Sequence, residues 1–175
     1  MPVRAARAGI IRGASVARRV EDLAQRSALC PDRYRGRLLR RAGVDIHPSA
    51  LVFSGLRLVG SATVTICEGA FINHDCLLEA SADIWIGPRV SLGNEVAVLT
   101  SEHDHSDPRQ RGGSRRLHPV RIEAGVWLGA RSTVLPGVTI GEGCVIGATS
   151  LVTSDCASHG LYVGAPARRV RELPT

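Results

Sequence analysis

The chain has 175 residues, 44% of them hydrophobic and 22% charged, which suffices for one compact domain and argues against a disordered chain. All 22 basic residues are arginine, which excludes Schiff-base lysine chemistry, pyridoxal-phosphate enzymes and the lysine-containing phosphate loop. Eleven of these arginines fall in residues 1–41 beside three acidic residues, so the net charge of +6 belongs to the N-terminal region and a nucleic-acid-binding core is disfavoured.

Residues 1–43 are predicted to form an arginine-rich helical extension. Residues 14–28 place their aliphatic side chains on one helical face, and a second helix is expected to begin at Asp32, as its N-cap, and to end at Gly43. A solvated helical face is the default interpretation. Packing on the end of the main domain, bridging between subunits and contact with anionic lipid are the alternatives, with membrane contact the least favoured.

From about residue 44 onward, aliphatic residues recur at every sixth position. The longest series is Ile122, Leu128, Val134, Ile140, Ile146 and Val152. An earlier series runs through Ile66, Ile72, Leu78 and Ile84, resumes two residues later at Ile86, Leu92 and Val98, and has a weaker start at Ile46, Val52 and Leu58. A period of six fits neither a helix nor a continuous strand. It predicts short strands joined by sharp corners.

Three such strands of about 16 Å each make one triangular coil, and the next coil stacks on it in parallel. Residues 18 apart are then expected to lie over one another, so that Val134 covers Val152 and Leu128 covers Ile146. The aliphatic column fills a narrow core, which explains why only six residues are aromatic. The small position of the repeat is filled by cysteine at 76, 144 and 156, and we interpret these thiols as packing residues.

The repeat is interrupted at about 99–120 by a polar stretch that contains three of the six histidines. A structureless loop of this length in a compact domain is usually functional or disordered. Imidazole titrates near neutrality and can accept a proton from an alcohol, so the composition suits an acid–base site.

The segments FINHDC at 71–76, LTSEHDHSDP at 99–108, and GVWLGARSTVLPGVTIGEGCVIGATSLVTSD followed by VGAPARRVRE near the end carry a family resemblance. The chain resembles the hexapeptide-repeat acyltransferases, most closely the O-acetyltransferases of maltose, galactosides and nodulation or capsular sugars. The resemblance implies a mainly β fold, a left-handed parallel β-helix over 44–175. It also implies acetyl-CoA as co-substrate, no metal, and a homotrimer with sites between subunits.

The same resemblance implies that His103, preceded by Thr100 at the matching spacing, is the general base. His105 and His118 are less favoured, and an exposed, idle histidine is the alternative for any loop position. Asn73 matches an asparagine that binds or orients the acceptor, although a structural asparagine at a tight corner competes with that role. Trp127 matches a tryptophan near the cleft, or else it caps the apolar column.

For the donor, the resemblance implies main-chain contacts to pantetheine at Ala130 and Ala148. Thr153, Arg168 and Arg171 would face the nucleotide and its phosphates. The family commonly has a lysine after the threonine, and here Ser154 stands in its place, so either Arg169 supplies part of the phosphate contact or the affinity for CoA is lower. A solvated arginine tail is the competing interpretation.

The resemblance predicts direct transfer in a ternary complex with a small-molecule acceptor. Ser81 stands where galactoside enzymes have an acceptor-binding carboxylate, so a sugar, an amino sugar and a natural-product hydroxyl all stay open. Two other functions compete. One is a zinc-binding γ-type carbonic anhydrase, and the other is a non-catalytic assembly module.

No apolar run approaches the roughly 18 residues of a membrane span, and the N-terminus lacks the apolar stretch of a signal peptide. The sequence therefore predicts a cytoplasmic protein. The five cysteines form no Cys-x-x-Cys pair, so we expect neither a disulfide framework nor a zinc knot.

Overall fold

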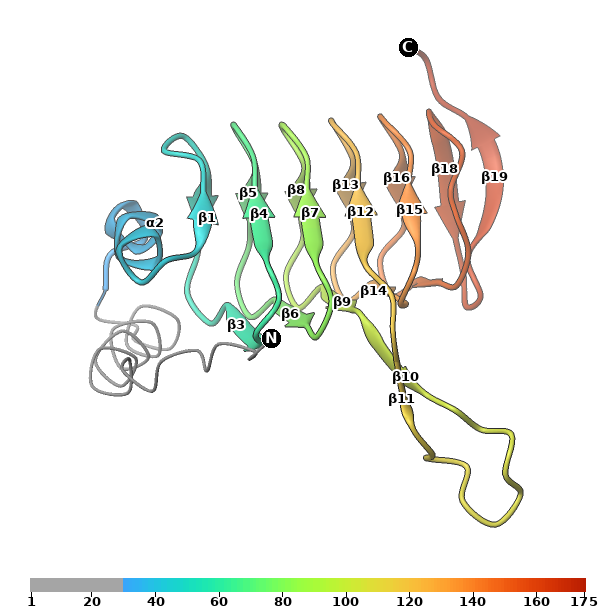
Figure 1. Cartoon of the computed structure of the whole chain (residues 1–175). Coiled ribbons are helices and arrows are strands. Elements are labelled where there is room, and N and C mark those ends of the chain that lie inside the picture. The colour runs from blue at the N-terminus through green and yellow to red at the C-terminus, as the bar shows by residue number, and fades with distance from the viewer. Residues whose placement is uncertain (1–29) are drawn as a thin grey trace, which may run out of the picture.

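The computed structural model describes residues 30–175, which wind into a parallel β-helix with one projecting ribbon (Figure 1). The helix predicted over 14–28 lies outside the described residues. Successive strands along the chain fall in turn on three sheets, called A, B and C here. Sheet A consists of β1 (Asp45–Ile46), β4 (Val64–Ile66), β7 (Ile84–Ile86), β12 (Val120–Ile122) and β15 (Thr139–Ile140).

The other two sheets complete each coil. The parallel strands of sheet B are β2 (Leu51–Val52), β5 (Phe71–Ile72), β8 (Ser91–Leu92), β13 (Trp127–Leu128), β16 (Val145–Ile146) and β18 (Gly160–Val163), and β19 (Arg168–Glu172) joins β18 antiparallel. Sheet C consists of β3 (Arg57–Gly60), β6 (Leu77–Ala80), β9 (Ala97–Leu99), β14 (Thr133–Val134) and β17 (Leu151–Val152). The predicted mainly β, parallel β-helix is therefore confirmed.

The core of the coil is the aliphatic column that the sixfold repeat predicted. All six members of the longest series, from Ile122 to Val152, are buried. Leu128 pairs with Ile146, and Val134 pairs with Val152, as expected from the 18-residue spacing. The three cysteines of the small position are buried in the same core. Burial of one aliphatic side chain contributes about 1.5–3 kcal/mol, so stacking of these narrow coils stabilises the fold.

The 18-residue stacking expected throughout is wrong for the first half of the coil. There the residues that pair across coils lie 20 apart, as in Ile46 with Ile66 and Leu58 with Leu78. The two extra residues lie between sheets C and A, where β3 and β6 are four residues long, twice the length of β14. The step of two between Ile84 and Ile86 in the sequence is the mark of this longer coil.

Helix α2 (Asp32–Arg41) packs against β1 and β2 at the first coil, with Leu39 fully buried. The expected N-cap role of Asp32 is wrong, because Pro31 takes the extended cap position and Asp32 is the first helical residue. At the other end, Gly43 has φ +99° and donates to the carbonyl of Arg40, and the next amide donates to Leu39. This pair of bonds is a Schellman motif, which ends the helix. No helix within residues 30–175 is long and apolar enough to cross a membrane.

The polar stretch is not a structureless loop, as the sequence suggested, but an antiparallel ribbon of β10 (Ser101–His103) and β11 (Arg115–Leu117). The ribbon leaves the coil after β9 and projects away from it, and the chain returns into β12 (Figure 1). Polar side chains in both strands and in the connecting residues explain why the segment stays outside the core.

Candidate functional site

His103 lies at the end of β10, on the outer part of the ribbon. Its Nδ1 is 2.8 Å from the carbonyl oxygen of Gly113 on the returning segment. A carbonyl only accepts hydrogen bonds, so Nδ1 carries a proton, and in the neutral ring Nε2 then keeps its lone pair. The ring is exposed, so Nε2 is open to an incoming hydroxyl. This is the tautomer that a general base needs.

The ribbon around His103 is fixed by polar contacts. The carboxylate of Asp104 lies 2.9 Å from Arg116 Nη2 and accepts the amide N–H of Ser106 at 2.9 Å. These bonds from Ser106 and Arg116 lower the pKa of Asp104 to about 2. Gly113 donates its N–H to the Asp104 carbonyl, and a Cβ at Gly113 would lie 2.8 Å from that oxygen. The turn of the ribbon therefore requires glycine at this position.

At the base of the ribbon, Thr100 is fully buried and its hydroxyl has two firm partners. It donates to the Glu79 carbonyl at 2.7 Å and accepts the Ala82 N–H at 2.9 Å. Ser81, at the position where a carboxylate was expected, donates its hydroxyl to the carboxylate of Glu79. A carboxylate therefore is present near Ser81, two residues earlier in the chain.

Trp127 lies in β13 of sheet B, and Asn73 directly follows β5 of the same sheet. The Asn73 side-chain oxygen accepts the N–H of His74 at 2.9 Å, so it is used in the corner after β5. Asp75, not Asn73, has the left-handed φ of that corner, at 60°. Trp127 is 55% exposed on the outer face of β13, so it does not cap the apolar column.

Ala130 and Ala148 lie at the corners between sheets B and C, and both are exposed. Among the hydrogen bonds of residues 30–175, none is donated by the amide N–H of either alanine. Glycine precedes each of them, and a Cβ at Gly129 would lie 2.5 Å from the Ala148 nitrogen. Glycine thus lets successive coils approach closely here. The corner presents two free main-chain donors in neighbouring coils.

The remaining donor candidates lie at the C-terminal end of the coil. Thr153 follows β17 at the corner between sheets C and A and is exposed. Arg168 and Arg171 are exposed on β19, where they pair with Val163 and Leu161 of β18. Arg169 donates to the Ser158 carbonyl at 3.3 Å. All three arginines therefore belong to the last strand, β19.

The chain does not bring all of these residues to one place. Trp127, Ala130 and Ala148 lie on sheet B or on the corner that follows it, whereas the ribbon with His103 leaves from the far end of sheet C. One edge of the triangle, about 16 Å for five extended residues, separates the two corners. The ribbon also points away from the coil (Figure 1).

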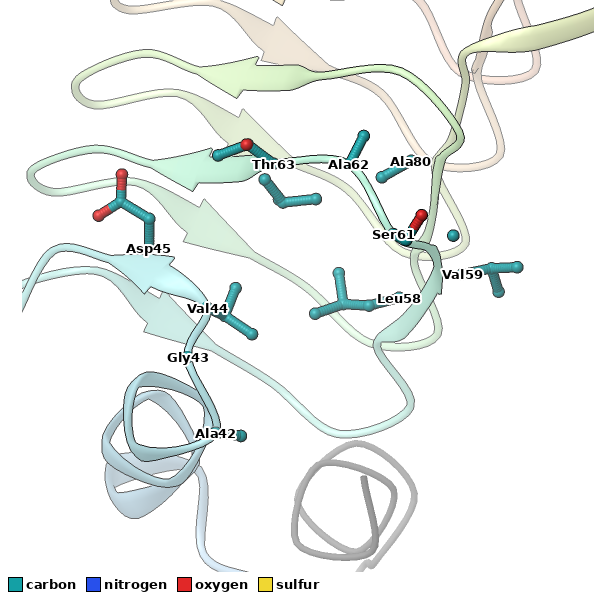
Figure 2. Close-up of a pocket in the computed structure, with 12 residues that line it drawn as sticks. Ala42, Gly43, Val44, Asp45, Leu58, Val59, Ser61, Ala62, Thr63 and Ala80 are labelled. Atoms are coloured by element: carbon teal, nitrogen blue, oxygen red, sulfur yellow. The ribbon is translucent and has the colours of Figure 1, made fainter. Parts of the chain in front are cut away.

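Two cavities help to define the surroundings. One of about 330 Å³ lies at the first coils, where Ala42, Val44, Leu58 and other small residues line it (Figure 2). Asp45 is the only carboxylate that the described residues contribute to this lining, and it accepts a hydrogen bond from the Thr65 hydroxyl at 3.0 Å. No histidine of the described part of the chain lines this cavity. A second cavity, of about 620 Å³, lies over sheet A and includes His118 from the ribbon base. There the Arg121 guanidinium stacks 3.8 Å from the centre of a Trp85 ring.

Metal and thiol chemistry have little support in the described part of the chain. Residues 30–175 contain no group of three or more histidine, cysteine, aspartate or glutamate side chains that could hold a metal ion. His118 lies 3.8 Å from the Glu102 carboxylate, while the His103 ring contacts Gly113. Desolvation by burial raises the pKa of Cys76 to about 11 and that of Cys156 to about 12, so neither is a ready nucleophile.

Two contacts at this site escaped the sequence analysis. The role of Gly113 depends on pairing across the ribbon, and the contacts of Glu79 depend on the stacking of β6 on β9. The glycines before Ala130 and Ala148 did leave a signal, since an aliphatic residue, glycine and alanine recur in that order 18 residues apart.

Comparisons with known proteins agree with the β-helix fold. Residues 119–154 match the family described as "Bacterial transferase hexapeptide (six repeats)". An acetyltransferase of Schizosaccharomyces pombe, named provisionally as such, is 41% identical over 103 residues, which are 59% of this chain and 50% of that protein. The galactoside O-acetyltransferase of Lactococcus lactis is 37% identical over 114 residues, which are 65% of this chain and 55% of that enzyme.

Among solved structures, a hexapeptide-repeat-containing acetyltransferase of Vibrio cholerae superposes with a TM-score of 0.76 at 27% identity, covering 96% of this chain and 95% of that chain. Its complex with acetyl coenzyme A superposes with a TM-score of 0.69 at 25% identity, covering 96% and 91%. The chain spans about half the length of the curated relatives it matches. The chain therefore has the fold of these solved structures, and its residues 119–154 match the hexapeptide-repeat family.

Proposed function

We propose that this hexapeptide-repeat protein transfers an acetyl group from acetyl-CoA to a hydroxyl or amine of a small acceptor, a sugar, an amino sugar or a natural product. The name of the Lactococcus lactis relative and the acetyl coenzyme A complex of the Vibrio cholerae protein support this reaction. Because acetyl-CoA is a metabolite of the cell interior, the proposal gives the enzyme a cytoplasmic location.

The observation that carries the proposal is the contact between His103 Nδ1 and the Gly113 carbonyl. With Nδ1 protonated, Nε2 takes the proton of the acceptor as its oxygen or nitrogen attacks the thioester carbon. The Gly113 carbonyl then stabilises the imidazolium, as an oriented acceptor does for any histidine base. A positioned base of this kind contributes about 10²–10⁴-fold to the rate.

The transfer proceeds in a ternary complex without an acyl-enzyme. The bond from the acceptor to the acetyl carbon forms, the carbon–sulfur bond breaks, and the proton held on His103 passes to the departing thiolate. A main-chain amide stabilises the oxyanion in between. Three of the cysteines are buried packing residues, which supports this route over one through a thioester on the enzyme.

The donor is proposed to lie along the corner between sheets B and C. The unpaired N–H groups of Ala130 and Ala148 suit the amide carbonyls of pantetheine, and Trp127 presents an exposed apolar face beside them. Arg168 and Arg171, with Thr153, would receive the nucleotide and its phosphates. Arg169 supplies the cation that Ser154 lacks.

The active site is proposed to form between two copies in a homotrimer. Within one copy, a whole edge of the triangle separates the ribbon from the donor corner. A threefold ring repeats one head-to-tail contact, so each ribbon can reach the sheet B corner of its neighbour. His103 of one copy then serves acetyl-CoA held by the next, and Asn73 contributes to the acceptor side.

The test is His103→Ala, with transfer measured by thiol release from acetyl-CoA over a panel of sugar acceptors. We expect activity to fall about 10²–10⁴-fold while calorimetric CoA binding stays intact. His105→Ala is the matched control, since it lies on the same ribbon and only its backbone carbonyl is bound, by Arg111. Full activity in the His103 variant would overturn the proposal.

A further inference from the structure

A carboxylate outside the proton-transfer step holds the base of the ribbon. Glu79, in β6, faces the point where the chain leaves β9, since it pairs in register with Leu99. We infer that Glu79 is a positioning residue, whose carboxylate sets the direction of the ribbon and thereby the place of His103. This inference rests on the proposed function, because it gives His103 the role of base.

The carboxylate contacts both strands of the ribbon. Its Oε2 accepts the amide N–H of Thr100 at 3.0 Å and that of Ser101 at 3.1 Å, where β10 begins. Its Oε1 accepts the hydroxyl of Ser81 and lies 3.6 Å from Arg115 Nη2, in β11. Arg115 also donates to the Ser81 hydroxyl. One anion therefore joins the outgoing strand, the returning strand and the coil.

The strand pairing of the ribbon connects the contacts of Glu79 directly to His103, the proposed general base. Arg115 is the residue that pairs with His103 across the ribbon, and Ser101 lies two residues before His103 in the same strand. A shift of either strand at its base therefore moves the imidazole. Misplacement of a catalytic group by about 1 Å can cost 10²-fold in rate.

The anchor is charged and mostly shielded from water. The Glu79 side chain is 18% exposed, whereas that of Arg115 is 53% exposed. Burial alone would raise the pKa of Glu79, yet the hydrogen bonds from Ser81, Thr100 and Ser101 outweigh it and hold the pKa below its usual value. The group is therefore an anion at neutral pH, and bonds from N–H groups to an anion are about twice as strong as neutral ones.

The coil does not depend on this carboxylate in the same way. The corner is separately held by the Thr100 hydroxyl, which bonds to the Glu79 carbonyl and to the Ala82 N–H. Leu78 and Val98, which pair with each other in β6 and β9 before the corner, are fully buried in the core. Removing the charge should therefore loosen the ribbon while the coil stays folded.

The experiment compares Glu79→Gln with wild type in the 175-residue chain. We expect kcat to fall about ten- to hundredfold, the KM for acetyl-CoA to stay within about twofold, and the melting temperature to change little. Hydrogen exchange should rise in peptides covering 100–118 and stay unchanged in the coil. Glu123→Gln is the matched control, because it breaks an ion pair with Arg121 that touches only the coil, and it should leave all four quantities unchanged.

The double variant Glu79→Gln/His103→Ala separates the inference from the proposed function. If Glu79 acts through His103, the second change adds nothing to the loss caused by His103→Ala. Two outcomes overturn the inference alone. One is a double variant that loses activity by the sum of the two single effects. The other is a Glu79→Gln enzyme with wild-type kcat while His103→Ala is inactive. An active His103→Ala overturns the proposed function, and hydrogen exchange then still decides whether Glu79 holds the ribbon.

Discussion

The coil and the ribbon are held together by different interactions, apolar burial in the coil and polar contacts in the ribbon. The coil repeats one step, in which a short strand buries an aliphatic side chain and a small residue turns the corner. Its aliphatic series is buried from Ile46 to Val152, except for Leu58, which is partly buried. The ribbon repeats nothing, and apart from Thr100 its residues up to Pro119 lie at least partly exposed and pair through polar contacts. Stability therefore belongs to the coil, and the proposed chemistry belongs to a segment that the coil only carries.

This separation has a thermodynamic basis. In a stacked repeat each coil contacts only its neighbours, so the free energy of unfolding is close to a sum of similar steps. A polar ribbon outside the stack contributes little to that sum, because exposed ion pairs are worth about 0–1 kcal/mol each. The ribbon can therefore change while the stack stays intact.

The largest expected difference between the coil and the ribbon is in the free energy of unfolding, and a matched pair of leucine truncations measures it. Leu128→Ala in the coil removes a fully buried side chain, and we expect the free energy of unfolding to fall by about 2–5 kcal/mol. Leu117→Ala in the ribbon removes a side chain that is 48% exposed, so its effect should stay within about 0.5 kcal/mol. Urea unfolding followed by circular dichroism measures both. Equal losses would mean that the ribbon is part of the folding unit.

A smaller effect is expected from acid. The pKa of Asp104 is lowered from 3.8 to about 2 in the folded ribbon by bonds from Ser106 and Arg116. A depressed carboxyl pKa stabilises the folded form above the unfolded pKa, and that contribution is lost as the pH falls through the folded pKa. The ribbon should therefore loosen between pH 4 and pH 2, while the coil is still folded.

Hydrogen exchange of peptides covering 100–118, corrected for intrinsic rates, follows this transition. Asp104→Asn removes one of the two carboxylates that hold the ribbon, so its ribbon should be looser at neutral pH. Its acid step should be smaller than that of wild type, and the remainder should come from Glu79, whose pKa is also lowered. Identical acid profiles in wild type and variant would rule out this role for Asp104.

The smallest effect concerns the thiols of the coil. Burial raises the pKa of Cys76 to about 11 and that of Cys156 to about 12, and it also raises the pKa of Cys144. At pH 8 these three side chains should resist iodoacetamide in the folded protein and react once urea unfolds it. Mass spectrometry locates the label. Rapid labelling of any of the three would show that the coil opens more readily than its packing implies.

The two regions also differ in how far the sequence predicted them. The period of six is local, so it located the aliphatic column of the core, except that Leu58 is only partly buried, and it did not locate other core residues such as Val90 and Val96. The step from Ile84 to Ile86 marks the longer first coils, but the sequence analysis expected a spacing of 18 throughout. The ribbon was missed because its strands pair through contacts between residues that are 12 to 16 apart and follow no period. The anchor at Glu79 was missed for the same reason, since its partners lie one coil away. At Asp32, the rigid backbone of the preceding proline took the cap position that the side chain suggested.

The site divides in the same manner. Motif resemblance proposed His103, and the Gly113 contact that selects its tautomer needed the folded ribbon. Ala130 and Ala148 were proposed as main-chain donors, and the free state of their N–H groups depends on the stacking of three coils. The strand order alone shows that, within one copy, the ribbon with His103 and these alanines belong to different corners.

The most direct test mixes two inactive chains. Ala148→Trp fills the proposed donor corner with an exposed bulky side chain, and His103→Ala removes the base. If each site joins the ribbon of one copy to the corner of the next, co-expressed trimers with random composition regain about a quarter of wild-type activity, since one combination in four carries both intact parts. Mixed trimers that stay as inactive as either variant alone would contradict a site shared between copies.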